Sequence, residues 1–435
     1  MADSEDRSSE ITKRAFALEA PITKVARDPV PLVFERGERC TLWDIDGSAY
    51  LDISGSYTAT CIGHNHPAIV RVARRQVGLL THAPSDYLTE PRLDLLEQVH
   101  SIAPEGLDRA AFSITGSDAN DLALKLARAH SGRPGVISFQ GGYHGRGHGA
   151  LAVSSLRGVK EAVAPPPASV HFAPYPGPGS PYASEADDDG EADARACIAF
   201  VRSLLEDPYG GPEPIGTVIL EVIQGSAGVV VPPRRFVEEV AALCSSHGIV
   251  MIVDEIQTGF GRTGRTWAIE HFGVVPDLLT FGKGIGGGLA TSGVLGGSQI
   301  MGSLPPGAHT TTFLTNALNL AVAAESVRVL QREGLVERAE QLGALLIERC
   351  HDVLGGLPNV GQIRGLGLLV GVELVTEAGE PDSDLASMVV RRARNEGLLL
   401  LLCGRHKNVL KLAPPLVIEP DELVGAVDTI RRVLA

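Results

Sequence analysis

The stretch Ile249-Val-Met-Ile-Val-Asp254 and the later stretch Leu278-Leu-Thr-Phe-Gly-Lys283 decide the fold. Each begins with a short, continuous apolar run, which is typical of a parallel strand buried on both faces. A charged residue follows each run, Asp254 in the first and Lys283 in the second. Because ligands of open α/β sheets bind at the carboxyl ends of the strands, we expect both side chains at one edge of one sheet.

The residues before Ile249 predict a helix that leads into this strand. Apolar side chains recur there at helical spacing from Phe236 to Cys244, and Gly248 suits the end of a helix. Glycine is frequent, with 50 of 435 residues, and it clusters beside apolar stretches. The sequence therefore predicts an α/β fold.

The length of 435 residues suggests two or three domains. The C-terminal part mixes a helical pattern over 335–353 with strand-like runs over 366–374 and 409–412, which suits a smaller α+β domain. The Pro- and Gly-rich segment 164–193, acidic from Glu185 onward, is expected to be a long surface excursion. The expected organisation is a disordered tail over 1–20, a small domain from 21–80 and 325–435, and a large domain over 81–324.

Composition excludes several classes of protein. The formal net charge of −14 argues against a nucleic-acid partner. We expect no membrane partner, because no apolar stretch approaches the roughly 20 residues of a membrane span. Six scattered cysteines without a C-x-x-C pair argue against disulfides or zinc and favour a reducing cytoplasm. His64-Asn-His66 has no further ligand in register, so we expect no metal site.

Lys283 carries the most specific chemical signal. It lies in Phe281-Gly-Lys-Gly-Ile-Gly-Gly-Gly288, where the glycines leave room for a bulky group beside the amine. A lysine in such a pocket can lose its proton and form a Schiff base. A solvated loop lysine is the plain alternative. The overlapping G-x-G-x-x-G pattern is a weak nucleotide signal, since no acidic residue occurs from Leu278 to Ala324.

Other residues could act with Lys283. A buried carboxylate at Asp254 needs a cationic partner, such as a protonated pyridine nitrogen, unless it caps a helix. The Gly116-Ser117 turn precedes a helical pattern and could bind phosphate, although Ser117 could simply be the N-cap. Tyr143 could stack on a planar ring, and Arg146 could bind a carboxylate.

These motifs together resemble the class III aminotransferases, which are pyridoxal-phosphate enzymes of fold type I. The resemblance implies an α/β large domain with a mixed, mostly parallel sheet and a smaller α+β domain. The resemblance runs from about Val33 to Leu434, with five separated motifs in the family's order. It implies that Lys283 binds the cofactor covalently, that Asp254 pairs with its ring nitrogen and that Gln257 contacts its phenolic oxygen. It also implies a homodimer, in which Thr312, before Phe313, reaches the phosphate of the neighbouring subunit. The cofactor-binding set that it implies is Gly116, Ser117, Asp118, Tyr143, His144, Asp254, Gln257, Lys283 and Thr312, with Lys283 and Asp254 catalytic.

The resemblance also implies a substrate class. Tyr57 and Arg146 match substrate-carboxylate contacts of the ornithine and 4-aminobutyrate enzymes, and other stretches resemble diaminobutyrate aminotransferases. We therefore expect transfer of a terminal amine to or from a 2-oxo acid. Ser226 and Lys411 stand where those enzymes usually have a Glu and an Arg, so we expect glutamate or its keto acid to be handled differently.

Three alternatives remain. A racemase or epimerase on the same fold is the strongest, because the Gly-Ser-Asp-Ala-Asn phrase at 116–120 and the missing Glu at Ser226 both occur in such enzymes. A decarboxylase of the dialkylglycine type is disfavoured by Tyr57, where a Gln is expected. An effector domain of a transcriptional regulator would need a DNA-binding helix-turn-helix, for which the residues before the fold leave no room.

Overall fold

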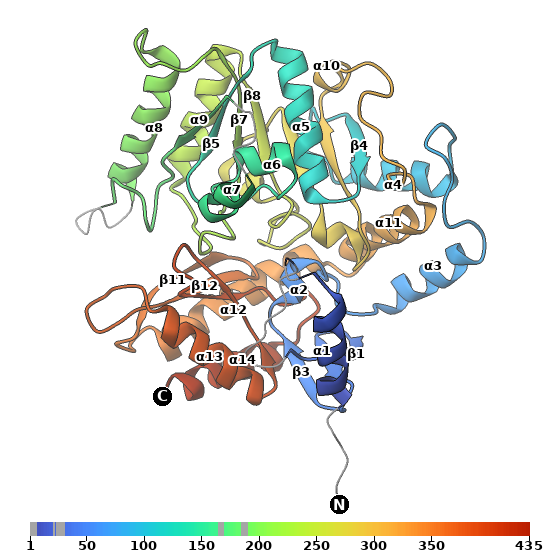
Figure 1. Cartoon of the computed structure of the whole chain (residues 1–435), viewed down its shortest axis with the longest axis vertical. Coiled ribbons are helices and arrows are strands. Elements are labelled where there is room, and N and C mark those ends of the chain that lie inside the picture. The colour runs from blue at the N-terminus through green and yellow to red at the C-terminus, as the bar shows by residue number, and fades with distance from the viewer. Residues whose placement is uncertain (1–6, 21, 23–30, 164–168, 184–189) are drawn as a thin grey trace, which may run out of the picture.

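The computed structural model describes residues 7–20, 22, 31–163, 169–183 and 190–435. Figure 1 shows two lobes, one above the other, with α11 and α3 beside their junction. The large lobe is built on a seven-stranded sheet of order β4-β10-β9-β8-β7-β5-β6. Neighbouring strands from β9 to β6 are parallel, whereas β10 is antiparallel to both β9 and β4. The predicted mixed, mostly parallel sheet is therefore confirmed. Its strands are β4 (Arg109–Ser113), β5 (Gly135–Phe139), β6 (Val170–Ala173), β7 (Ile215–Leu220), β8 (Val250–Asp254), β9 (Leu278–Phe281) and β10 (Ser292–Gly296).

Both faces of this sheet are covered by helices. Val250 and Ile252 of β8 pack in one apolar cluster with residues of α5 (Gly116–Ser131), whereas Met251 and Val253 pack in another with residues of α9 (Arg234–His247). Because successive strand residues point to opposite faces, α5 and α9 lie on opposite sides. The other helices of this lobe and its rim are α3 (Pro67–Val77), α4 (Glu90–Ser101), α6 (His148–Val153), α7 (Arg157–Val163), α8 (Glu191–Glu206), η1 (Ala268–Phe272), η2 (Lys283–Gly286), α10 (Ser298–Met301) and α11 (Ala317–Arg332).

The small lobe contains two four-stranded sheets, of order β1-β2-β3-β13 and β11-β12-β15-β14, packed with helices. This agrees with the expected α+β composition. Its elements are α1 (Arg7–Leu18), β1 (Phe34–Glu38), β2 (Thr41–Asp44), β3 (Ala49–Asp52), α2 (Gly55–Thr58), α12 (Leu335–Leu354), β11 (Val360–Leu366), β12 (Leu369–Leu374), α13 (Ser383–Asn395), β13 (Leu398–Leu399), β14 (Leu401–Cys403), β15 (Val409–Leu412) and α14 (Pro420–Leu434).

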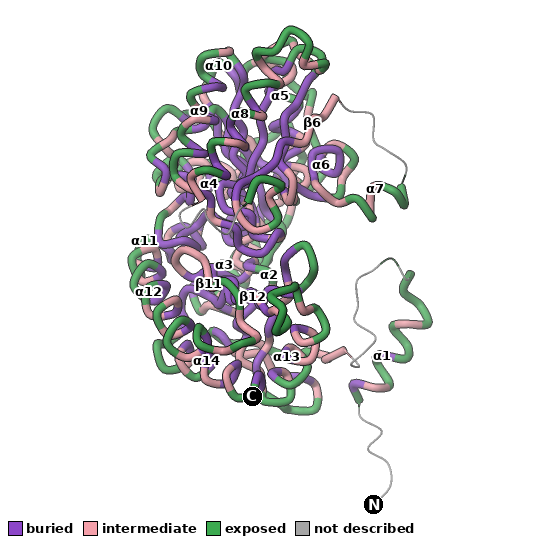
Figure 2. Tube along the Cα trace, turned by 90° about the vertical axis from the view of Figure 1, so that its left-hand side faces the viewer, coloured by how far each residue is buried: buried purple, intermediate pink, exposed green. Residues whose placement is uncertain are grey.

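The structure differs from two sequence-based expectations for local structure. Within the expected disordered tail over 1–20, residues 7–18 form α1, and residues 1–6 lie outside the described ranges. Ser8 is buried and its Oγ donates to Asp46 Oδ2 at 2.5 Å. Figure 2 shows that most of this helix is exposed, which explains its weak apolar signal. The run 366–374 is not one strand, because Gly367 (φ 54°) turns the chain between β11 and β12.

The excursion expected over 164–193 contains more structure than the sequence suggested. It includes β6, which pairs with β5, and α8 begins at Glu191. The acidic run from Glu185 to Asp189 lies outside the described residues, whereas Asp193 is buried and accepts a hydrogen bond from the backbone N–H of Gly177 (2.7 Å). The expected domain limits stay a prediction: α11 spans residue 325 and packs on both α3 and α4. Among the described residues, no helix is both long and apolar enough to cross a bilayer.

Candidate active site

Asp254 and Lys283 emerge at the same edge of the large sheet. β8 runs parallel to β9, and Asp254 at its last position pairs with Thr280 of β9. Lys283 follows β9 after one residue and opens the short helix η2 with a backbone φ of 40°. The prediction that both strands present their charged ends at one sheet edge is confirmed.

The Lys283 amine lies in an environment that favours loss of its proton. Burial and, to a lesser extent, the nearby positive charge of Lys411 lower its pKa from 10.5 to about 8. The carboxylates of Asp254 and Glu221 act in the opposite direction. A substantial fraction of this amine is therefore neutral near pH 8, which is the state needed for nucleophilic attack.

The carboxylate of Asp254 is held from three sides. Oδ2 lies 2.8 Å from Nδ1 of His144, and it accepts a hydrogen bond from Nδ2 of Asn120 at 2.8 Å. Oδ1 accepts one from the backbone N–H of Ile256 at 3.0 Å. Asp254 is 4% exposed and His144 2% exposed, so this network is shielded from water.

Glu221 is a site residue that the sequence analysis missed. It directly follows β7 and accepts hydrogen bonds from the backbone N–H groups of Tyr143 (2.7 Å) and Gly225 (3.3 Å). Burial raises its pKa from 4.5 to about 7. The signal that revealed Asp254, a carboxylate directly after a buried apolar run, would also have revealed Glu221.

The first turn of α5 is a candidate anion site. Thr115, not Ser117, is its N-cap: its Oγ1 accepts from the N–H of Asp118 at 3.2 Å, and its carbonyl accepts from Ala119. This corrects the N-cap interpretation of Ser117. The backbone N–H groups of Gly116 and Ser117 remain at the end of the helix that attracts anions.

Glycine residues allow the loop after β5 to pack closely against this turn. The Ser117 hydroxyl accepts a hydrogen bond from the backbone N–H of Gly147 at 2.8 Å. At Gly145 the backbone has a φ of 130°, and a Cβ there would lie 2.6 Å from Ser117 Oγ. The Asp118 carboxylate lies apart from Ser117, 3.4 Å from the imidazole of His309.

Gln257 and Tyr143 lie at the same sheet edge. Gln257, three residues after Asp254, is buried. Its side chain fills the space beside Gly225, where an added Cβ would lie 2.0 Å from Gln257 Oε1. Tyr143 is half-buried, and its backbone is bound to Glu221. The geometry thus gathers the predicted residues Lys283, Asp254, His144, Tyr143 and Gln257.

Lys411 is a buried cation near Lys283. It lies in β15, where it pairs with Leu401 and Gly371, and it is 5% exposed. Burial lowers its pKa below the usual value for a lysine. Among the described residues, no carboxylate forms an ion pair with its ammonium group.

The other predicted substrate residues differ in exposure. Ser226 is partly buried, and its carbonyl accepts from the backbone N–H of Gly404 at 3.0 Å. Tyr57 is 55% exposed, and Arg146 is also exposed. Within the described part of the chain, no hydrogen bond joins Thr312, which is exposed, to another predicted site residue.

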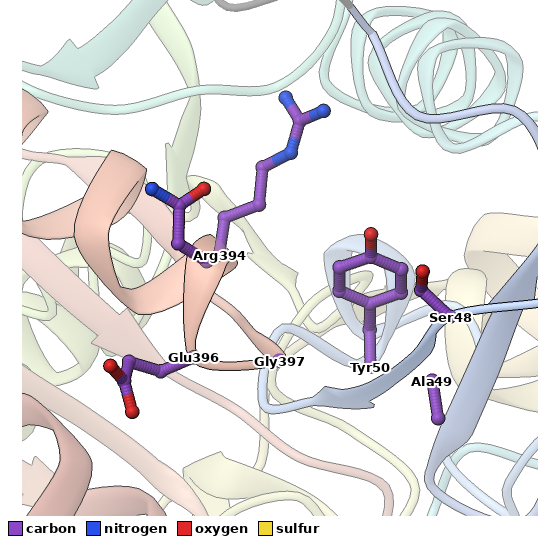
Figure 3. A pocket seen from close by; sticks show the side chains of 7 residues that line it. Ser48, Ala49, Tyr50, Arg394, Glu396 and Gly397 are labelled. Carbon is purple, nitrogen blue, oxygen red and sulfur yellow. The ribbon is translucent and has the colours of Figure 1, made fainter. Parts of the chain in front are cut away.

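Two further observations bear on function, although neither concerns this edge of the sheet. A surface hollow, seen in Figure 3, is lined by residues 48–50 and 394–397 of the small lobe, with the Tyr50 hydroxyl and the Arg394 guanidinium facing its open space. None of the predicted site residues lines it. In the described ranges, no group of three or more His, Cys, Asp or Glu side chains could hold a metal ion.

Comparison with known proteins identifies the family. The model of the class III aminotransferases matches residues 22–434. The 4-aminobutyrate aminotransferase GabT of Escherichia coli is 34% identical over 92% of this chain and 93% of its own length. A leucine/methionine racemase of Thermococcus litoralis is also 34% identical, over 99% and 96%.

A solved structure agrees with the fold. The ornithine aminotransferase of Toxoplasma gondii superposes with a TM-score of 0.83 at 29% identity, over 98% of this chain and 94% of that one. Fold type I and the resemblance drawn from the sequence motifs are thereby confirmed. The chain belongs to the class III aminotransferases, a family of pyridoxal-phosphate-dependent enzymes.

Proposed function

We propose that this enzyme transfers the terminal amine of an ω-amino acid, a diamino acid or a related amine to or from a 2-oxo acid such as 2-oxoglutarate or pyruvate. The observation that carries this proposal is the buried ammonium of Lys411, which lies close to Lys283 and forms no ion pair with a carboxylate of the described residues. A buried charge is costly unless it is paired, so this position suits a substrate carboxylate.

The residues of the sheet edge fit pyridoxal phosphate. The N–H groups of Gly116 and Ser117 would hold the phosphate, Asp254 the ring nitrogen, Gln257 the phenolic oxygen and Tyr143 a ring face. Asp254 Oδ1 accepts a single described hydrogen bond and so retains capacity for a cation. His144 fixes the Asp254 carboxylate, and Asp118 completes the helix turn that carries Ser117.

When bound, the cofactor supplies an electron sink that acidifies the carbon beside the amine. Lys283 would hold the cofactor covalently. As a neutral amine, it would act as a general base that takes a proton from the substrate carbon and then, as a general acid, donate a proton to a different atom. Its pKa of about 8 makes both steps accessible near neutral pH. Glu221, on the same edge, supports the Tyr143 loop through its backbone hydrogen bond.

Substrate binding is assigned to four residues. Lys411 would bind one carboxylate, and the exposed Arg146 could bind a second by its planar fork. Tyr57 would line the entrance. Ser226 carries no charge, so it would not compete with a substrate carboxylate for Lys411.

A homodimer with shared sites accounts for the exposure around Thr312. Phe313 is 57% exposed beside it and packs on His82, with ring centroids 5.4 Å apart. The neighbouring Leu79 and Leu88 are 68% and 83% exposed. Exposed apolar side chains of this kind suit contact with a second copy of the chain, whose site Thr312 would help to complete. The six free, buried cysteines support a cytoplasmic location.

Racemisation or epimerisation is the second candidate. The relative from Thermococcus litoralis is a racemase, and the chain is as similar to it as to the aminotransferase from Escherichia coli. Such an enzyme would act on one substrate and would need no 2-oxo acid.

A donor panel separates the two candidates. The purified holoenzyme is incubated with ω-amino acids, diamino acids and α-amino acids, each with and without 2-oxoglutarate or pyruvate. We expect a new amino acid only when both a terminal amine and a 2-oxo acid are present. Loss of optical activity without a 2-oxo acid would instead establish the racemase, and neither outcome for any donor would refute both.

A further inference from the structure

Asn120 lies at the centre of a buried polar network behind the candidate cofactor site. It is in the first turns of α5 and is 0% exposed. Its Nδ2 donates to Asp254 Oδ2 at 2.8 Å and to the backbone carbonyl of His144 at 2.7 Å. Its Oδ1 accepts from the hydroxyl of Thr280 at 2.8 Å. One amide therefore joins α5, the end of β8, the loop after β5 and β9.

The partners fix the orientation of this amide. The Asp254 carboxylate and the His144 carbonyl accept hydrogen bonds, so both must face the NH₂ group. A flipped amide would place its oxygen against two other oxygens and leave the Thr280 hydroxyl without its acceptor. The network therefore has one satisfied arrangement, which holds the Asp254 carboxylate in one rotation.

That rotation decides which Asp254 oxygen can meet a ligand. Asn120 and His144 both lie at Oδ2, whereas the single hydrogen bond to Oδ1 from the described residues comes from the Ile256 N–H. We propose that Asn120 is a positioning residue for the cofactor: it occupies Oδ2 of Asp254 so that Oδ1 is presented to the cationic ring nitrogen. This inference rests on the proposed role of Asp254 and not on the identity of the amine.

Two substitutions test the amide directly. N120A removes both donors, and N120D keeps the size of the side chain but places a second carboxylate beside Asp254. T280V is a milder change, because it removes only the hydrogen bond that orients the amide oxygen. S138A is the matched control: Ser138 is also 0% exposed and its Oγ donates to the carbonyl of Val153 at 2.6 Å, with no described contact to Asp254.

Two readouts independent of turnover are measured on each full-length protein. The first is the dissociation constant of pyridoxal phosphate from the apoenzyme. The second is the midpoint of the pH dependence of the visible absorption of the holoenzyme, which shifts when the charge on the ring nitrogen changes because that nitrogen is conjugated with the chromophore. Circular dichroism of each apoenzyme establishes that it is folded.

We expect N120A and N120D to weaken cofactor binding about tenfold to hundredfold, as expected for loss of a hydrogen bond to a charged group, and to shift the spectral midpoint by about one pH unit. T280V should weaken binding severalfold, and S138A by less than twofold. Binding and spectra of N120A within twofold of the unmodified protein, or equal losses in N120A and S138A, would overturn the proposal. If neither Asn120 variant folds, T280V becomes the deciding variant, and unchanged cofactor binding in T280V would overturn the proposal.

This result is separable from the donor panel. A protein that uses no terminal amine could still lose its cofactor upon N120A substitution, and a protein that uses one could still bind cofactor normally without Asn120.

Discussion

Asp254 and Lys411 act in opposite directions on the Lys283 amine: the carboxylate raises the pKa of that amine, and the second ammonium lowers it. The three side chains come from β8, β15 and the turn after β9, so elements of both lobes set the protonation state of one group. Burial adds to the effect of Lys411 and brings the pKa to about 8. The charge on Lys283 is thus a property of the assembled fold.

Attachment of the cofactor to Lys283 is expected to depend on pH. The neutral amine is the nucleophile, so the rate at which pyridoxal phosphate reacts with the apoenzyme should rise through a midpoint near pH 8. K411M removes the neighbouring positive charge and should move this midpoint upward, whereas E221Q removes a negative charge and should move it downward. Stopped-flow absorbance over a pH series measures the rate. A midpoint near 10 in the unmodified protein would show that the amine is not perturbed by this environment.

Glu221 is expected to make the stability of the apoenzyme depend on pH. Burial raises its pKa from 4.5 to about 7, so folding favours the protonated carboxyl. Its contribution is complete below about pH 4.5 and is lost as the pH rises through about 7. E221Q cannot ionise, so its Tm relative to the unmodified protein should be higher at pH 8 than at pH 5. Thermal melts at both pH values measure this, with E97Q as an exposed control; an equal difference at the two pH values contradicts the prediction.

The sequence was sufficient to predict the sheet edge because the signal there is local. A buried parallel strand reads as a continuous apolar run, and β8 and β9 fall within one residue of the predicted stretches. Glu221 follows β7 with the same signal, and it was missed because no other motif marked it. The N-cap of α5 was harder to predict than the sheet edge. Thr115 and Ser117 are both good capping residues, and only the backbone geometry distinguishes them.

The role of Asn120 could not have been predicted in the same way. Its three partners lie 24, 134 and 160 residues away along the chain. No periodicity or spacing rule relates positions this far apart, because the contact exists only after β8 and β9 have paired beside α5. Exposure of Tyr57 and burial of Lys411 also depend on how the two lobes pack, which residue type alone does not determine.

Removal of the Lys411 ammonium is expected to weaken binding of the 2-oxo acid. K411A should raise KM for the acid about tenfold to hundredfold, as expected for a lost charge-assisted hydrogen bond of about 1.5–3 kcal/mol, with a smaller change in kcat. K407A is the matched control, because Lys407 lies four residues earlier, in the connection from β14 to β15, and is exposed. Steady-state kinetics over a range of acid concentrations give both constants. Equal KM values in K411A and K407A would exclude a carboxylate role for Lys411.

A strained turn beside the site gives the last prediction. Ser56, Tyr57 and Thr58 of α2 have φ values of 49°, 62° and 68°, in the left-handed region that favours glycine. Thr58 is also β-branched, and its buried Oγ1 has no hydrogen-bond partner among the residues that the structure describes. T58G should therefore raise the free energy of unfolding by about 1 kcal/mol, because relief of backbone strain and removal of an unsatisfied hydroxyl exceed the entropic cost of glycine.

The neighbouring Thr60 provides the matched control for that change. Its Oγ1 is likewise buried and has no hydrogen-bond partner in the described part of the chain, but its backbone φ is not positive. T60G gains no strain relief and should lower the free energy of unfolding by about 1 kcal/mol. Urea unfolding of the two variants, followed by circular dichroism, should therefore give shifts of opposite sign. Because Tyr57 precedes Thr58 and is assigned to the substrate entrance, T58G should also lower kcat/KM while it stabilises the protein. Destabilisation by both substitutions would show that the left-handed turn stores no strain that glycine can release.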